Sequence, residues 1–217
     1  MADMPYTPRP TAAQKRRAER ILGILKNLFP DAGIVLNYRT PWELMVAVQL
    51  SAQCTDKKVN EVTEKLFTKY RNLDDYVNAD AGEFQKDIYQ TGFYKNKTKN
   101  ILAAAKMVKK DFGGKLPRSM EEMLKIPGVA RKTANVVLGN AFGVVEGIAV
   151  DTHVLRLSRQ LGLTVHEDPV KVERDLMALF PEQEWLRLTY RLIEYGRKYS
   201  PAHKKDHSGE PLESLYV

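Results

Sequence analysis

The feature that most constrains this chain is the stretch from Leu124 to Leu138, LKIPGVARKTANVVL. Proline cannot continue a helical hydrogen-bond ladder and glycine accepts the backbone angles of a tight turn, so Pro127-Gly128 predicts the end of a helix. After Val129 the apolar residues recur at helical spacing, which predicts a second helix with one buried face. The stretch therefore predicts two helices joined by a short hairpin, residues 127–130.

The start of this second helix is chemically distinctive. The first backbone N–H groups of a helix have no partner within it, and the helix dipole adds partial positive charge, so an anion such as phosphate binds well there. Lys132 lies just inside the helix. Pro-Gly turns between helices also occur without any ligand, so this stretch alone leaves both an anion site and an ordinary turn open.

Positive charge is concentrated around the hairpin. The net charge is +7, and eleven lysines and arginines lie between Thr91 and Thr133 against three acids, so the rest of the chain is near neutral. A basic face of this kind favours a polyanionic partner, of which nucleic acid is the first candidate. The alternative is a lysine-rich helix that is merely solvated.

Composition narrows the class of protein. The 217 residues are 43% hydrophobic and 28% charged, which is typical of a globular chain of one large or two small domains. No apolar run approaches the ~20 residues that span a bilayer. The one cysteine excludes an internal disulfide and any cysteine-based metal cluster, and it favours a reducing compartment. We expect a cytoplasmic protein, or a nuclear one if the source is eukaryotic.

Helical patterns run along most of the chain and no convincing strand is present, so we predict an all-α protein of about ten helices. Thr40-Pro41 opens a very apolar helix predicted to reach about Cys54, and Asp56 is predicted to cap the next. Asp151 is predicted to cap a helix through Leu161. Further helices are predicted over residues 11–29, 73–77, 80–89, 94–112, 168–179 and 182–199.

Four motifs together resemble one known family. They are LSAQCTD (50–56), TGFYKNK (91–97), IPGVARKTANVV (126–137) and AVDTHV (149–154). In order and spacing they resemble endonuclease III, a family of helix-hairpin-helix DNA glycosylases with AP-lyase activity. The resemblance runs from about Arg20 to the C-terminus. It implies two helical lobes: a six-helix barrel over 34–145, and a second lobe that pairs 1–33 with 146–217, with the substrate base entering between them.

The resemblance also implies DNA contacts. The hairpin would hold phosphates through its backbone N–H groups, Gln53 would fill the gap left by an extruded nucleotide, and Phe93 would press into the base stack. From the residues alone, Gln53 also fits a polar helix end and Phe93 a core position. The DNA-binding residues implied are Gln53, Phe93, Pro127, Gly128, Val129, Ala130, Arg131, Thr133 and, in a phosphate-contacting or supporting role, His153.

Lys132 and Asp151 match the family's catalytic pair. By resemblance, the Lys132 amine would attack C1′ of the sugar, expel the base and form a Schiff base, after which β-elimination cuts the strand. Arg131, the helix N-terminus and burial in a closed cleft would all disfavour the charged ammonium, which suits a nucleophile. The Asp151 carboxylate would stabilise positive charge developing at the sugar or accept a proton. An N-cap without catalytic function is the alternative for Asp151.

The chain departs from the family pattern at its end. Most relatives carry four cysteines there that hold an iron–sulfur cluster, and these positions fall on Ser200, His207, Glu210 and Tyr216. We therefore predict no cluster, because thiolates are what hold it, and no other metal. We expect packing of Leu212, Leu215 and Tyr216 to hold the tail. A second departure is Ala130, where the family usually has glycine.

The leading hypothesis is a base-excision-repair glycosylase and AP lyase that removes oxidised pyrimidines, such as thymine glycol, from duplex DNA. The alternatives are a monofunctional glycosylase for mismatched or alkylated bases and a non-catalytic helix-hairpin-helix DNA-binding protein. Lys132 disfavours the first alternative, and the pair of Lys132 and Asp151 disfavours the second. The expected partner is double-stranded DNA with a damaged base or an abasic site, bound by a monomer that has no membrane association.

Overall fold

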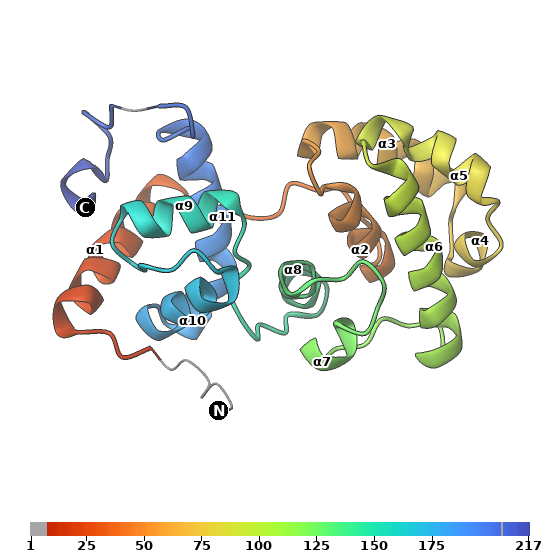
Figure 1. The fold of residues 1–217 in the computed structure, drawn as a ribbon, viewed down its shortest axis with the longest axis horizontal. Coiled ribbons are helices and arrows are strands. Elements are labelled where there is room, and N and C mark those ends of the chain that lie inside the picture. The colour runs from red at the N-terminus through yellow and green to blue at the C-terminus, as the bar shows by residue number, and fades with distance from the viewer. Residues whose placement is uncertain (1–7, 205) are drawn as a thin grey trace. The chain divides into compact units, whose positions relative to one another are not determined.

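The computed structural model describes residues 8–204 and 206–217, which contain helices and no β-strand, so the predicted all-α class is confirmed. The chain divides into two compact units (Figure 1). Unit 1 consists of Met1–Ile34 and Gly147–Val217, and unit 2 of Val35–Glu146. Within the described ranges, no helix is both long and apolar enough to cross a bilayer.

Unit 2 contains seven α-helices and one short 3₁₀ helix. Their bounds are α2 Pro41–Leu50, α3 Asp56–Lys69, α4 Leu73–Val77, α5 Ala81–Ile88, η1 Tyr89–Thr91, α6 Tyr94–Asp111, α7 Met120–Met123 and α8 Arg131–Phe142.

Helix α2 is the centre of unit 2. Every residue from Glu43 to Leu50 is buried, and the helix packs against α3, α6 and α8. The buried Glu43 carboxylate accepts hydrogen bonds from the Arg39 backbone N–H at 2.7 Å and from its guanidinium at 2.9 Å, so this charge is not left unpaired. The predicted apolar helix is thus confirmed as a core element.

Two predicted details around α2 are wrong. The helix ends at Leu50 rather than near Cys54, because the Ser51 hydroxyl donates to the Val48 carbonyl at 2.9 Å and residues 51–54 form a turn. The next helix is capped by Thr55, whose hydroxyl accepts from the Lys58 backbone N–H at 3.3 Å. The predicted cap, Asp56, is instead its first residue.

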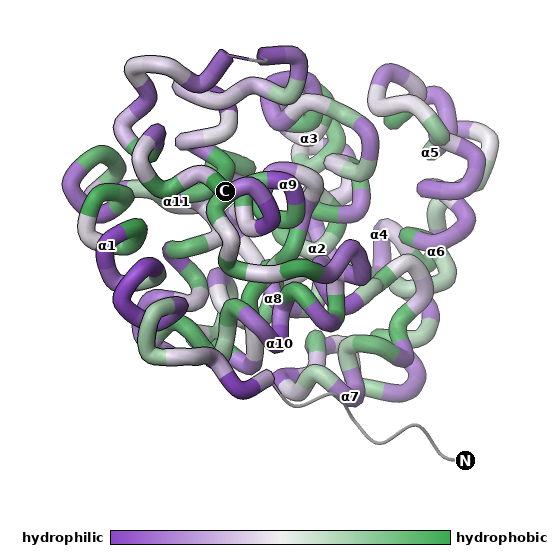
Figure 2. Tube along the Cα trace, turned by 60° about the vertical axis from the view of Figure 1, so that its left-hand side comes forward, coloured by the Kyte–Doolittle hydropathy of each residue, from purple (hydrophilic) through white to green (hydrophobic). Residues whose placement is uncertain are grey.

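Unit 1 is built from α1 Ala12–Leu28, α9 Thr152–Gln160, α10 Pro169–Leu179, η2 Glu182–Glu184, α11 Trp185–Lys198 and η3 Glu213–Leu215. The inner faces of the four long helices meet in one apolar core that includes Ile21, Leu157, Leu176 and Leu188. Figure 2 shows the alternation of hydrophilic and hydrophobic residues along α1 that produces such a buried face.

The tail after α11 folds back onto unit 1. Leu212 and Leu215 are buried in its core, as predicted, and Tyr216 packs against it. The tail also contains a buried carboxylate, Glu210, which accepts hydrogen bonds from the Tyr216 hydroxyl at 2.6 Å, the Lys204 ammonium at 2.8 Å and the Tyr195 hydroxyl at 3.1 Å. The His207 Nδ1 atom lies 2.9 Å from the same carboxylate. Apolar packing and a polar network therefore hold the tail together.

The charge of Glu210 stabilises this network. Burial by itself raises the pKa of a carboxyl group, but the hydrogen bonds from Lys204, Tyr216, His207 and Tyr195 outweigh it and lower the pKa of Glu210 to about 2. The unfolded chain, with an ordinary glutamate pKa, binds a proton at higher pH than the folded chain does. The stabilisation is therefore complete above pH ~4.5 and is lost as the pH falls towards about 2.

We predict that Glu210→Gln lowers the free energy of unfolding at neutral pH by about 2 kcal/mol, because the charge-assisted hydrogen bonds are weakened. Urea unfolding followed by circular dichroism between pH ~7 and ~3 measures this. The variant should also lose less stability than the wild type as the pH falls. Glu182→Gln, at an exposed acid of the same unit, is the control. Equal stability of Glu210→Gln and the wild type at every pH would contradict the assignment.

Candidate active site

A hairpin joins α7 and α8, as predicted, but α7 ends at Met123 rather than directly before Pro127. The Ile126 backbone N–H donates to the Met123 carbonyl and the Val129 N–H to the Ile126 carbonyl, each at 3.1 Å, which closes two tight turns. Gly128 has φ +76°. Ala130 is extended, with φ −90° and ψ 169°, so alanine fits here without backbone strain.

Helix α8 begins without a side-chain cap. Its N-cap residue is Ala130, which has no side-chain oxygen to accept from the first-turn N–H groups. Helices α2, α3, α9 and α10, in contrast, are all capped by a threonine or aspartate oxygen. Because no side chain caps the first turn of α8, its backbone N–H groups and the helix dipole suit an anion at the hairpin.

Gly128 is required by space as well as by conformation. A Cβ atom at this position would lie 2.8 Å from Asn100 Cβ and 2.8 Å from Gln49 Oε1, both too close for packed atoms. The Gln49 side-chain amide also donates to the Pro127 carbonyl at 3.3 Å. The hairpin is thus pressed directly onto α2 and α6.

Lys132 is the second residue of α8, and its side chain is exposed. It follows Arg131 and precedes Thr133, both half-buried, while the residues from Ala134 to Gly139 are buried against the core of unit 2. The buried side of α8 therefore fixes the helix while Lys132 stays accessible to a substrate.

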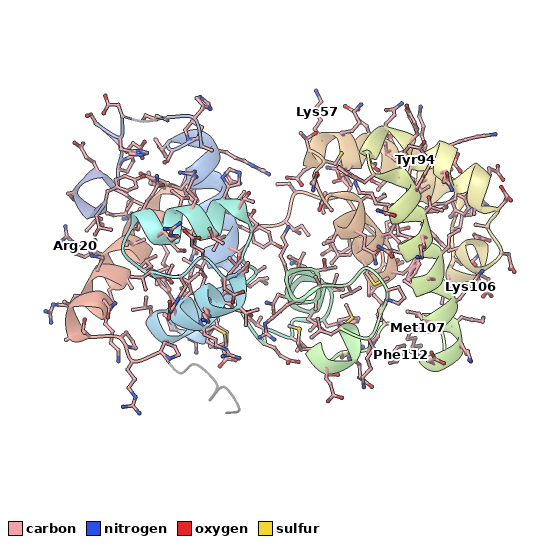
Figure 3. The ribbon with its side chains drawn as sticks, viewed as in Figure 1. Arg20, Lys57, Tyr94, Lys106, Met107 and Phe112 are labelled. Atoms are coloured by element: carbon pink, nitrogen blue, oxygen red, sulfur yellow. The ribbon has the colours of Figure 1, made fainter. Side chains whose placement is uncertain are left out.

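The two predicted wedge residues share an unusual conformation. Gln53 has φ +54° and Phe93 has φ +47°, and in the described part of the chain they are the non-glycine residues with positive φ. The core interpretation of Phe93 is wrong, because its side chain is 62% exposed. The rings of Tyr89 and Tyr94 lie 4.9 Å apart on either side of it in sequence, and Tyr94 is labelled near the N-terminal end of α6 in Figure 3.

A cavity of about 210 Å³ in unit 2 brings several of these residues together. Gln53, Phe93, Gly128 and Thr133, all predicted DNA-binding residues, line it. The candidate site residues of unit 2 thus come from three separate segments, the turn after α2, the start of α6 and the hairpin.

The remaining predicted residues belong to unit 1. Asp151 is half-buried and caps α9, as predicted, through its Oδ1 atom, which accepts from the Val154 N–H at 2.8 Å. His153 lies on the side of α9 that packs against α11, where a Cβ atom at Gly196 would be only 2.6 Å from its Nδ1 atom. Burial is the main cause that lowers the pKa of His153, which favours the neutral imidazole.

One lysine of the predicted basic face is buried. Lys97 is 94% buried and lines the cavity beside Gln53 and Phe93. Its place at the end of the TGFYKNK motif, one helical turn after Phe93, was the available signal.

The residues present do not fit an iron–sulfur cluster. Ser200, His207, Glu210 and Tyr216 supply no thiolate, and Cys54, the one cysteine, belongs to unit 2. Glu210 is buried, and its oxygens already accept hydrogen bonds from protein groups. Among the described residues, no group of three or more histidines, cysteines or acids could hold a metal ion.

Comparisons with known proteins agree with the motifs. Residues 46–182 match the family model described as HhH-GPD superfamily base excision DNA repair protein. Endonuclease III of Synechocystis sp. is 49% identical over 196 residues, which cover 90% of each chain. Two solved structures match with a TM-score of 0.89 and 43% identity, a non-covalent endonuclease III–DNA complex and a trapped endonuclease III–DNA covalent intermediate. Each covers 93% of this chain, and 94% and 95%, respectively, of the other.

A family model that spans more than half of the chain, together with a relative of this identity and coverage, settles the family. The structural matches extend the agreement to the arrangement of the helices and to proteins solved with DNA. This chain therefore belongs to the endonuclease III family of helix-hairpin-helix proteins, and it is a base-excision DNA glycosylase.

Proposed function

We propose that this glycosylase is bifunctional: it removes oxidised pyrimidines, such as thymine glycol, from duplex DNA and then cuts the strand as an AP lyase. The observation that carries the proposal is Lys132, an exposed amine in the first turn of α8, directly after an uncapped hairpin that suits a phosphate. A DNA-binding module or a monofunctional glycosylase has no need for an amine at this position.

Binding would begin at the hairpin. The backbone N–H groups at the start of α8, which no side chain caps, hold a backbone phosphate, and this contact positions the enzyme without reading sequence. Gln53 and Phe93, both exposed, enter the base stack and replace the extruded nucleotide. In this proposal unit 2 is the family's six-helix barrel, and unit 1 is its second lobe.

Chemistry would follow at the exposed sugar. The neutral Lys132 amine forms a bond to C1′ while the glycosidic bond breaks, and the base leaves with a proton. Opening of the sugar ring gives a Schiff base, and loss of a C2′ proton then expels the 3′ phosphate. Asp151 stabilises the positive charge that develops at the sugar. The similarity to an endonuclease III trapped covalently on DNA supports this sequence of steps.

We predict that borohydride traps the intact protein covalently on a duplex that contains thymine glycol or an abasic site, and that Lys132→Ala lowers trapping by roughly 1000-fold or more. Lys65→Ala, at an exposed lysine of α3, is the matched control and should trap normally. Gel electrophoresis of the labelled duplex measures the adduct.

The outcomes separate the candidate functions. Removal of the base without any adduct would identify a monofunctional glycosylase. Adduct formation by Lys132→Ala would place the nucleophile elsewhere. Failure to release thymine glycol, with normal trapping at an abasic site, would reject the oxidised-pyrimidine substrate and leave the lyase chemistry intact.

We predict that Gly128→Ala weakens binding to abasic-site duplexes by about tenfold or more, because the added Cβ pushes the hairpin away from Gln49 and Asn100. Gly143→Ala is the control, because φ is +66° there and nothing lies within 4 Å of an added Cβ. Both variants carry the cost of a left-handed alanine, and only the first displaces the hairpin. Fluorescence anisotropy measures the affinity, and equal weakening by the two variants would argue against the phosphate grip.

We also propose that the enzyme works without an iron–sulfur cluster, its place in the tail being taken by the Glu210 network. Purified protein should show no absorbance band at about 400 nm and no stoichiometric iron by elemental analysis. Its thermal unfolding should be unchanged by chelators. Iron-containing, coloured protein would contradict this proposal.

A further inference from the structure

The side chain of Lys97 places an ammonium group in the interior of unit 2, which is uncommon for a lysine. It is 94% buried in α6, and its ammonium donates to two backbone carbonyl oxygens, of Leu50 and Thr91, each at 2.8 Å. No carboxylate pairs with it within the described residues. A buried ammonium is costly unless it is paired or hydrogen-bonded, so these two bonds are what keep it in place.

The two carbonyl groups mark the starts of two loops. Leu50 is the last residue of α2, and the turn after it carries Gln53. Thr91 is the last residue of η1, and Phe93 follows two residues later. One side chain therefore connects two segments that lie about 40 residues apart in sequence.

Both loops hold a strained residue. Gln53 and Phe93 have left-handed backbones, which cost roughly 1–2 kcal/mol for residues other than glycine. Neither has a side-chain anchor in the core, since both are exposed. Such conformations persist only where the surrounding structure determines them, and the bonds from Lys97 lie two to three residues from each.

We propose that Lys97 is a positioning residue that holds the Gln53 and Phe93 loops together in the conformation that enters DNA. The inference rests on the proposed function, in which these two residues are the wedge. A wedge that is ordered in advance does not lose conformational entropy when the nucleotide is extruded. Lys97 itself needs no contact with substrate.

The surroundings of Lys97 agree with this role. Lys97 lines the 210 Å³ cavity together with Gln53 and Phe93, which belong to the two loops. Burial lowers the pKa of Lys97, and the nearby Cys54, which follows Gln53 in the same loop, acts in the opposite direction.

The test uses a duplex that carries a tetrahydrofuran abasic analogue with 2-aminopurine opposite. The analogue cannot form a Schiff base, so the fluorescence rise of the unstacked 2-aminopurine reports the wedge without any chemistry. At saturating protein, checked by anisotropy, the wild type should raise the fluorescence and Lys97→Met should lose most of the rise. Lys65→Met, the same substitution at an exposed lysine of unit 2, should behave as wild type.

A second variant and a double-mutant comparison guard against a general folding defect. Lys97→Arg keeps donors and charge and should retain about half of the rise or more. In a Gln53→Ala/Phe93→Ala background, Lys97→Met should have no further effect, because a residue that acts through the wedge is silent once the wedge is gone.

The kinetic readout is single-turnover trapping on abasic sites in duplex and in single-stranded DNA. Lys97→Met should slow trapping on the duplex by about 10- to 100-fold relative to the single strand, where no stacked nucleotide must be displaced. Equal losses on both substrates, or additive losses in the wedge-free background, would overturn the inference. A wild-type protein that gives the fluorescence rise but no adduct would refute the lyase proposal and leave Lys97's role standing.

Discussion

The burial of α2 from Glu43 to Leu50 is the constraint on which unit 2 depends. A helix that is buried around its whole circumference must contact several partners at once, and the last turn of α2 provides many of these contacts. The Gln49 side-chain amide donates a hydrogen bond to the Pro127 carbonyl in the hairpin. The Leu50 carbonyl accepts a hydrogen bond from the Lys97 ammonium, and Gln53 follows three residues later. The core and the candidate site are thus one continuous structure, so a change in core packing at the end of α2 is transmitted directly to the residues that we propose contact DNA.

In unit 1 the structural requirement is different, because an irregular tail must be held against the helices. Metal–thiolate bonds are one solution, and a buried carboxylate surrounded by hydrogen-bond donors is another. Glu210 draws Tyr195 of α11 together with Lys204, His207 and Tyr216 of the tail, while Leu212 fills the core beneath. A polar network needs no metal supply and is insensitive to oxidation, but it depends on the ionisation of one group.

Features that depend on neighbouring residues could be predicted from the sequence, whereas features that depend on tertiary contacts could not. The cap at Asp151 could be predicted because a cap acts within one turn of its own position. The left-handed backbone of Gln53 and Phe93 could not be predicted, since neither residue is a glycine. The burial of Lys97 could not be predicted either, because one of the two carbonyl groups that accept from its ammonium, that of Leu50, belongs to a segment 47 residues earlier.

The absence of a side-chain cap at α8 lowers the stability of the helix but favours the binding of an anion at its N-terminus. A serine or aspartate at position 130 would recover about 1 kcal/mol of helix stability, but its oxygen would occupy the N–H groups that we assign to phosphate. With Ala130 as the N-cap, the first turn of α8 lacks a hydrogen bond from a capping side chain in the free protein. The extended backbone at position 130 would accommodate many other side chains. Selection for thermal stability alone would therefore favour replacements at the very position where they compete with the ligand.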